Sequence, residues 1–310
     1  MLDISRKFNT LRIAVARATV LVSPGSVELI HKGKVPKGDC LGVAKVAAVQ
    51  AAKKTAEIIP YCNPLPLDFV GVEFKMGEDR IEITTTVKAI YKTGVEMEAL
   101  TAAATAALTI YDMLKMLDSA LEITGVFLVS KKGGKSDFKA SFDAAPQAAV
   151  LLISTQAAAG TKDDIAGRMV AERLQQEGVE VVQYEIVPAE EETVENSLIA
   201  FTDRMKLDLV LTAGGTAFNS DDWLPEITRR IIEREIPGIT EAARSFGQQR
   251  TPYSMLSRGV AGTRGKTLIV NLPGSRKGVA DTLDALFPGL LHSLKMIRGG
   301  GHPERRNLEG

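Results

Sequence analysis

The chain has 310 residues, with 38 basic and 38 acidic side chains and a formal net charge of zero. This balance argues against a dedicated binder of nucleic acid or anionic membranes, which normally carries a basic excess. Two cysteines are too few for a disulfide framework, the N-terminus has no apolar signal-peptide core, and no apolar run approaches the ~20 residues that span a bilayer. We therefore expect a cytoplasmic protein without a nucleic-acid or membrane partner, and the length predicts two domains.

The first half of the chain predicts an α+β domain. β-Branched residues alternate with polar ones on both sides of the turn at 77–79, which indicates a hairpin, and Ala-rich sequence indicates helices. The elements expected here are strands at 14–22, 69–76, 80–90 and 121–129, and helices at 26–31, 42–59 and 95–117.

The second half alternates strands with helices. Its strands are apolar, as in LDLVLT and TLIVNL, which is typical of a parallel sheet covered on both faces. The elements expected here are strands at 149–154, 180–187, 207–212 and 267–272, and helices at 164–176, 193–205, 222–234 and 277–297.

The sign of the charge changes between the two halves. Residues 1–140 carry 19 basic and 15 acidic side chains, and the rest carry 19 and 23. The boundary falls beside Lys131 to Gln147, which is rich in Gly, Ser, Lys and Asp and which we interpret as a linker. Its first half is equally compatible with a mobile active-site loop. The predicted limits are a first domain at 1–138, a linker at 139–148, a second domain at 149–298 and a flexible tail at 299–310.

Asp112 and Lys115 are the most unusual pair in the first half. They lie three residues apart on one face of a predicted helix, among apolar neighbours. A carboxylate and an ammonium in apolar surroundings shift each other's proton affinity, as general acid–base chemistry requires. An ordinary surface ion pair has the same spacing, and on spacing alone that interpretation is favoured.

The loops before the predicted helices carry further polar residues, each with an ordinary structural explanation. Lys37 precedes one helix and suits an anion, although a simple capped turn fits as well. Glu98 opens the long helix, about 21 Å from Asp112 at the rise of an α-helix. The two cannot share one small site within a subunit. If both are functional, either the ligand is long or another chain completes the site.

The first 138 residues resemble the cyclic pyranopterin monophosphate synthase family of molybdenum cofactor biosynthesis. The resemblance rests on MLDIS, KGD, CNPL, KTGVEMEALTAA, TIYDMLK and KKGGKSDF, in the family's order and spacing. It implies a ferredoxin-like α+β subunit in a hexamer built from dimers and trimers, with sites between subunits and no tightly bound cofactor. The implied reaction converts a cyclised dihydro-GTP to cyclic pyranopterin monophosphate and releases pyrophosphate.

By this resemblance, Asp112 and Lys115 are the acid–base pair. The family histidine of the Cys-X-Pro-Leu loop is Asn63 here, which can form hydrogen bonds but cannot carry a proton at neutral pH. The implied substrate-binding residues are Arg12, Lys37, Cys62, Asn63, Lys92, Glu96, Met97, Glu98, Lys131 and Lys135.

Two glycine loops follow strands of the second half, Thr212 to Thr216 and Asn271 to Ser275. Ligands of open α/β sheets bind at the carboxyl ends of the strands, and glycines let a phosphate or pterin approach the backbone. Two such loops favour a nucleotide or phosphate site.

The second half resembles the molybdopterin adenylyltransferase family, through STQAAAGTKD, IVPAE, LTAGGTAFNSDDWLPEIT, REIPGI, MLSR and AGTRGKTLIVNLPGS. The resemblance implies a three-layer α/β/α fold, usually trimeric, that transfers AMP from ATP to molybdopterin with Mg²⁺, for which Asp222 is the implied ligand. The implied pterin- or nucleotide-binding residues are Ser154, Asp164, Gly214, Gly215, Thr216, Asp222, Asn271, Pro273, Gly274 and Ser275.

Three departures weaken this second resemblance. The fourth glycine of the family motif is Ala217, which would be strained at a positive φ; Thr155 and Ala189 stand where the family has aspartates, and Glu190 is adjacent. The domain is then either a working adenylyltransferase or a domain that binds pterin or assembles the protein, and we favour the second alternative. The sequence as a whole predicts a bifunctional protein of molybdenum cofactor biosynthesis, with a non-catalytic scaffold as the rival interpretation.

Overall fold

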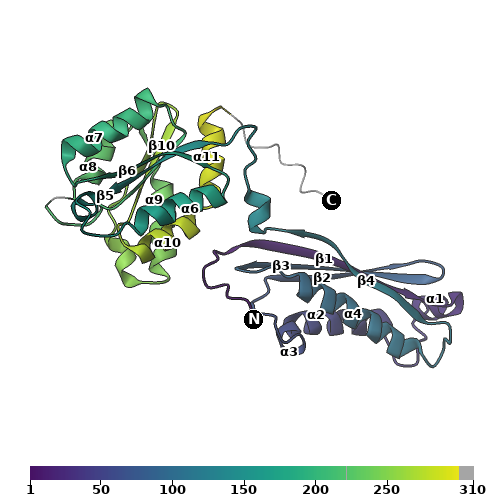
Figure 1. The fold of residues 1–310 in the computed structure, drawn as a ribbon. Coiled ribbons are helices and arrows are strands. Elements are labelled where there is room, and N and C mark those ends of the chain that lie inside the picture. The colour runs from purple at the N-terminus through teal and green to yellow at the C-terminus, as the bar shows by residue number, and fades with distance from the viewer. Residues whose placement is uncertain (221, 300–310) are drawn as a thin grey trace. The chain divides into compact units, whose positions relative to one another are not determined.

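The chain forms two compact units in a computed structural model that describes residues 1–220 and 222–299. The first unit comprises Met1–Asp137 and the second begins at Phe138 (Figure 1). The tail predicted at 299–310 lies outside the described residues from residue 300 onward. Within the described ranges, no helix is both long enough and apolar enough to cross a membrane.

The first unit is an antiparallel sheet with helices on one face (Figure 1), so the predicted α+β class is confirmed. Its strands pair in the order β2-β3-β1-β4. Its elements are β1 (Thr10–Leu21), α1 (Pro24–His31), α2 (Cys40–Lys53), α3 (Thr55–Ile58), β2 (Phe69–Met76), β3 (Arg80–Tyr91), α4 (Glu96–Leu114), β4 (Glu122–Lys132) and the 3₁₀-helix η1 (Lys135–Phe138).

Small residues bring α4 close to both α2 and the sheet. Ala99, Ala103 and Ala107 are fully buried on α4, as are Ala44 and Ala48 on α2. β1 alternates buried and half-buried residues, because successive strand side chains point to opposite faces. The core therefore fixes the position of α4 along its whole length, including its two ends.

The second unit is a mostly parallel sheet between two helical layers, as predicted. Its strands pair in the order β6-β5-β7-β10-β9-β8, and β8 and β9 are antiparallel to their neighbours. Separate apolar cores cover its two faces. Its elements are β5 (Gln147–Ile153), α5 (Thr155–Ala158), α6 (Ala166–Gln176), β6 (Glu180–Val187), α7 (Glu191–Ile199), the π-helix η2 (Ala200–Arg204), β7 (Leu209–Ala213), α8 (Leu224–Ile231), β8 (Arg234–Glu235), α9 (Pro237–Gln248), the 3₁₀-helix η3 (Pro252–Leu256), β9 (Ala261–Arg264), β10 (Thr267–Leu272), α10 (Arg276–Leu286) and α11 (Gly289–Ile297).

Several predicted boundaries were wrong for local reasons. The helix expected at 277–297 is divided into α10 and α11, because a proline lacks an N–H and keeps the preceding residue, Phe287, extended. The helix expected at 42–59 is divided at Lys54 into α2 and α3. Helix α9 was not predicted at all, although it begins at Pro237, a favoured first helical residue.

The segment expected as a linker is partly folded. β4 continues through Lys132, and η1 follows it directly. Ala140 and Phe142 then pack against the core of the second unit, and β5 already begins at Gln147. Most of 131–147 is therefore used by one unit or the other.

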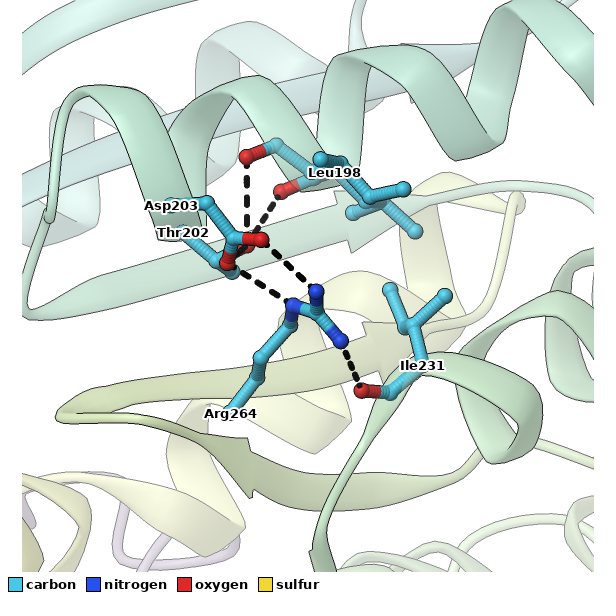
Figure 2. A network of polar contacts seen from close by, with 6 residues as sticks. Leu198, Thr202, Asp203, Ile231 and Arg264 are labelled. Atoms are coloured by element: carbon cyan, nitrogen blue, oxygen red, sulfur yellow. Dashed lines mark hydrogen bonds and ion pairs between the residues drawn. The ribbon is translucent and has the colours of Figure 1, made fainter.

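A partly exposed network of polar contacts lies at η2 in the second unit (Figure 2). Arg264 donates from Nε and Nη2 to the two carboxylate oxygens of Asp203, at 2.8 and 2.6 Å, and from Nη1 to the carbonyl of Ile231 at 2.9 Å. Thr202 donates to the carbonyl of Leu198 at 3.0 Å. Hydrogen bonds from Arg264 lower the pKa of Asp203 to about 2. The network connects the helix after α7 to the β9–β10 turn.

We predict that Asp203→Asn lowers the free energy of unfolding of the second unit by about 1 kcal/mol at pH 7, a modest value because both partners are partly exposed. The pKa of Asp203 is lowered on folding, so its contribution is complete above pH 4 and is lost as the pH falls toward 2. The chain has one tryptophan, Trp223, whose fluorescence follows unfolding of this unit. Asp163→Asn, at an exposed carboxylate, is the control. If the difference in the free energy of unfolding between the wild type and Asp203→Asn does not become smaller below pH 4, the assignment of this interaction is contradicted.

Candidate functional site

The first unit has a cavity of about 490 Å³ at the start of α4. Its walls come from the N-terminal segment, the loop after α3 and the β3–α4 loop. Among the substrate-binding residues expected from the sequence, those that line it are Cys62, Asn63, Glu96, Met97 and Glu98.

Glu98 is a buried carboxyl group in the wall of this cavity. It is 4% exposed, and burial raises its pKa, opposed by a hydrogen bond from its own backbone N–H and reinforced by Glu96. Burial also raises the pKa of the Cys62 thiol, to which Glu98 adds. Both changes favour the protonated forms. The Cys62 thiol, the Asn63 amide and the Glu98 carboxyl group give this wall polar groups that can form hydrogen bonds with a ligand.

Arg12 and Lys131 bring positive charge to the same end of α4. Arg12 donates from Nε to the carbonyl of Tyr91 at 3.3 Å and from Nη2 to the carbonyl of Lys92 at 3.5 Å. It therefore holds the loop that carries Lys92, a task that the sequence did not predict for it. Lys131 Nζ lies 3.3 Å from Oε1 of Glu96.

The segment after β4, for which the sequence predicts a linker or a mobile active-site loop, is attached to β1. The carbonyl of Gly133 accepts from the Thr10 hydroxyl at 2.7 Å, and its N–H donates to Asp137 at 2.7 Å. Gly133 has φ +99°, and an added Cβ would lie 1.8 Å from the carbonyl oxygen of Leu11. Lys135, farther along, lies 5.8 Å from the centre of the Phe8 ring.

Asp112 and Lys115 lie at the other end of α4, together with Lys37. Lys115 Nζ is 2.8 Å from Oδ1 of Asp112, and Lys37 Nζ is 2.7 Å from Oδ2. Hydrogen bonds from Lys115 and Lys37 lower the pKa of Asp112 to about 2, and Asp112 raises the pKa of Lys115. Both groups are therefore charged at neutral pH in the single chain.

The apolar shelter expected around this pair was wrong for the single chain. The side chains of Asp112 and Lys115 are 56% and 53% exposed. Their apolar neighbours Ile110, Met113 and Leu114 point into the core, because the helical repeat places them on the opposite face. The predicted residues therefore form two groups, one at each end of α4, and a single chain does not bring the groups together.

The second unit has a cavity of about 600 Å³ at the carboxyl ends of β7 and β10. These strands are parallel neighbours, with Ala213 beside Leu272, so the loops that follow them meet at one edge. The residues expected from the sequence that line this cavity are Gly215, Thr216, Asp222, Asn271, Pro273, Gly274 and Ser275.

Gly214 and Asn271 support this edge from inside. Gly214 has φ +95°, and an added Cβ would lie 2.4 Å from the carbonyl oxygen of Ile153. The Asn271 amide donates to the hydroxyls of Thr212 and Thr228 at 3.2 and 3.1 Å, and its oxygen accepts from Val260 N–H at 3.1 Å. The amide group is thus used within the fold.

Ala217 is accommodated without the strain that the sequence suggested. Among the described residues, the positive φ angles of this loop belong to Gly214 and Gly215. Arg258 holds the loop by donating to the carbonyls of Ala217 and Asp222 at 2.7 and 2.6 Å.

Ser154 and Asp164 lie outside the residues that line this cavity. Ser154 accepts from Ala157 N–H at 3.2 Å as the cap of α5. Asp164 is buried and accepts from Gly167 N–H at 2.7 Å and from the Tyr184 hydroxyl. Burial, followed by this hydrogen bond, raises the pKa of Tyr184. These bonds give both residues a structural task.

The carboxylates of the second unit that the structure describes do not gather into a metal site. No group of three His, Cys, Asp or Glu side chains suited to a metal occurs within 1–220 and 222–299. Asp222 accepts from Asn219 N–H at 3.0 Å, and Asp281, also in the cavity wall, lies 4.0 Å from Nε of Arg250. The N–H of Ala189 donates to the Thr155 hydroxyl at 3.2 Å, where the family pattern would place two carboxylates. This set of oxygen ligands does not fit a resident Mg²⁺.

Sequence reasoning missed part of the cavity wall. Arg244 comes from α9, Tyr253 from η3, and Lys277 and Asp281 from α10. The available signals for the first two were the prolines that begin α9 and η3, because proline favours the first position of a helix.

Two family models match the chain in succession. The model described as "MoaC family" matches residues 1–134, and the one described as "Probable molybdopterin binding domain" matches residues 149–292.

Relatives with matching names cover most of the chain or a part of it. A "Molybdenum cofactor biosynthesis bifunctional protein" of Chlorobaculum tepidum is 38% identical over 302 residues, which covers 97% of this chain and 96% of the relative. One of the same name from Synechococcus elongatus is 33% identical over 315 residues, covering 97% and 98%. A "Cyclic pyranopterin monophosphate synthase" of Aquifex aeolicus is 48% identical over 136 residues, covering 44% of this chain and 54% of the relative.

We predict that Gly133→Ala destabilises the first unit by more than the about 1–2 kcal/mol that a left-handed residue costs, because its Cβ also collides with the Leu11 carbonyl. The measurement is thermal unfolding followed by circular dichroism, with hydrogen exchange of β4. Gly38→Ala is the matched control, since Gly38 has φ +95° but no atom within 4 Å of an added Cβ. Equal losses of stability in the two variants would show that the close approach of Gly133 to β1 is unimportant.

Proposed function

The chain belongs to the family of bifunctional molybdenum cofactor biosynthesis proteins, and from this we propose how its two halves work. The first half is of the cyclic pyranopterin monophosphate synthase type, a lyase, and the second is related to molybdopterin-binding domains. The observation that carries this conclusion is the match to two-domain relatives along 97% of the chain.

The reaction proposed for the first half is the conversion of a cyclised dihydro-GTP to cyclic pyranopterin monophosphate with release of pyrophosphate. Such a substrate combines a purine-derived ring with a triphosphate. The cavity beside Glu98 suits the ring because the Cys62 thiol, the Asn63 amide and the Glu98 carboxyl group line it and can form hydrogen bonds. Arg12, Lys92 and Lys131 supply nearby positive charge for phosphates.

A complete site in this proposal uses two copies of the chain. The cavity lies at the start of α4, and Asp112 with Lys115 lies at its end, about 21 Å from Glu98. A neighbouring subunit that presents its own Asp112 and Lys115 to this cavity would unite the two groups. We propose a ferredoxin-like subunit in a hexamer of dimers and trimers. The β-α-β-β-α-β order and the strand order β2-β3-β1-β4 support the ferredoxin-like assignment.

Lys115 is the proton donor in this mechanism, and Asp112 is the carboxylate that orients it. In the single chain Asp112 raises the pKa of Lys115, which keeps the ammonium protonated. Coverage by a second subunit would remove water and lower the affinity of Lys115 for its proton, so that it can donate to the ring. Lys37, bonded to the same carboxylate, places a second ammonium group there for a phosphate.

We propose that the second half binds molybdopterin at the β7–β10 edge without adenylylating it. Ala189 and Thr155 remove carboxylates that ATP-bound Mg²⁺ would use, while the glycine loops remain. The alternative is that this half transfers AMP from ATP, with Asp222 as the metal ligand. The two alternatives are distinguished by one product, adenylylated molybdopterin. The functional domain limits of 1–138 and 149–298 and the cytoplasmic location stay predictions.

We predict that Lys115→Ala loses at least about a hundredfold in turnover, because the proton donor is removed, while the fold is kept. The assay follows pyrophosphate release from purified cyclised dihydro-GTP by the full chain. Lys54→Ala is the matched control, since Lys54 is also exposed and lies 3.9 Å from Glu57 at the same three-residue spacing. Normal turnover of Lys115→Ala would reject the acid–base assignment.

We also predict that the full chain, given molybdopterin, ATP and Mg²⁺, forms little or no adenylylated product. Ala189→Asp restores a carboxylate after β6 and should raise the yield. Robust transfer by the wild-type chain that falls in Glu190→Gln would show that Glu190 replaces the missing aspartate, and the binding-only proposal would be wrong.

A further inference from the structure

Two exposed aromatic side chains line the cavity of the second unit. Phe218, in the loop after β7, is 65% exposed, and Tyr253, in η3, is 73% exposed. They come from segments 35 residues apart in the sequence, yet both belong to the wall of one cavity. Large exposed aromatics at a cavity mark binding surfaces more often than isolated ones do.

The backbone under both rings is held in place. Arg258 fixes the loop of Phe218 through the carbonyls of Ala217 and Asp222. The turn of Tyr253 is capped by Thr251, whose hydroxyl accepts from the Tyr253 N–H at 3.4 Å. The hydroxyl of Ser254 donates to the carbonyl of Arg244 on α9 at 3.1 Å. The two rings are therefore exposed on segments that hydrogen bonds hold in place. Such rings offer flat surfaces that lose little conformational freedom when a ligand binds.

The wall of this cavity is polar at the start of α10 and apolar at its end. Ser275 caps the helix and Lys277 lies in its first turn, while Leu286 lies in the last turn, about 14 Å away at the rise of an α-helix. Ile239 and Ala243 of α9 add apolar surface. Free N–H groups and an ammonium at one end suit an anion, and the apolar wall with two aromatics suits a flat ring.

We propose that Phe218 and Tyr253 are specificity-determining residues that stack on the flat heteroaromatic ring of the ligand, whose anionic group lies at the start of α10 beside Lys277. This proposal rests on the proposed binding function of the second half and adds the residues that select the ring. Pterins and adenine nucleotides share the required chemistry, a fused nitrogen heterocycle with an anionic substituent, and the test separates them.

Calorimetric titration of the full chain with pterin-6-carboxylate and, separately, with AMP tests the proposal. Phe218→Leu and Tyr253→Leu should each bind about tenfold more weakly, because an aliphatic side chain cannot stack. Phe218→Tyr and Tyr253→Phe should bind like the wild type. Met255→Ala is the matched control, since Met255 is 67% exposed in the same η3 turn but does not line the cavity. Thermal unfolding followed by Trp223 fluorescence checks that each variant folds.

The outcomes separate this inference from the proposal beneath it. Binding that weakens in Lys277→Ala but stays within twofold of wild type in both leucine variants overturns the stacking role and leaves pterin binding intact. A wild-type chain that binds neither probe below 1 mM overturns both proposals. Stacking losses seen with AMP alone support the role of the two rings and reject pterin as the ligand.

Discussion

The close packing of α4 against α2 and the sheet is the constraint on which the first unit depends. Its buried alanines pack so closely that they prevent the helix from sliding or tilting, since close-packed interiors tolerate little change in volume. The helix therefore acts as a fixed spacer between a cavity with a buried carboxyl group and an exposed cluster of one carboxylate and two ammonium groups. Chemistry that uses both must join ends that one chain keeps apart.

The cavity of the second unit depends on a different feature, the carboxyl ends of two parallel strands. β7 and β10 are neighbours, so two distant loops meet where both strands end. Glycine at position 214 lets the backbone approach Ile153, and the Asn271 amide connects three elements behind the cavity. The cavity is formed although Ala189 and Thr155 stand where the resembled family has carboxylates. The proposed function, binding without adenylylation, is consistent with this, because backbone geometry and metal-binding groups depend on different residues.

Much of this was predictable from the sequence, and the failures have physical causes. The strands at 69–76, 180–187 and 267–272 and the glycine loops follow from periodicity and loop chemistry. The exposure of Asp112 did not, because apolar neighbours in sequence face the opposite side of a helix. The sequence suggested backbone strain at Ala217, but the positive φ angles of the described loop belong to its glycines. The aromatic wall was missed because Tyr253 follows a helix whose proline start was not recognised.

The length of α4 has a genetic consequence. Two defective alleles, one altered beside Glu98 and the other at Lys115, damage opposite ends of the same helix. If two copies of the chain complete one site, as proposed, mixed oligomers in a cell that expresses both alleles would pair an intact cavity from one chain with an intact lysine from the other. The alleles would then complement each other, and each would behave as recessive, even though every polypeptide in the cell carries a lesion.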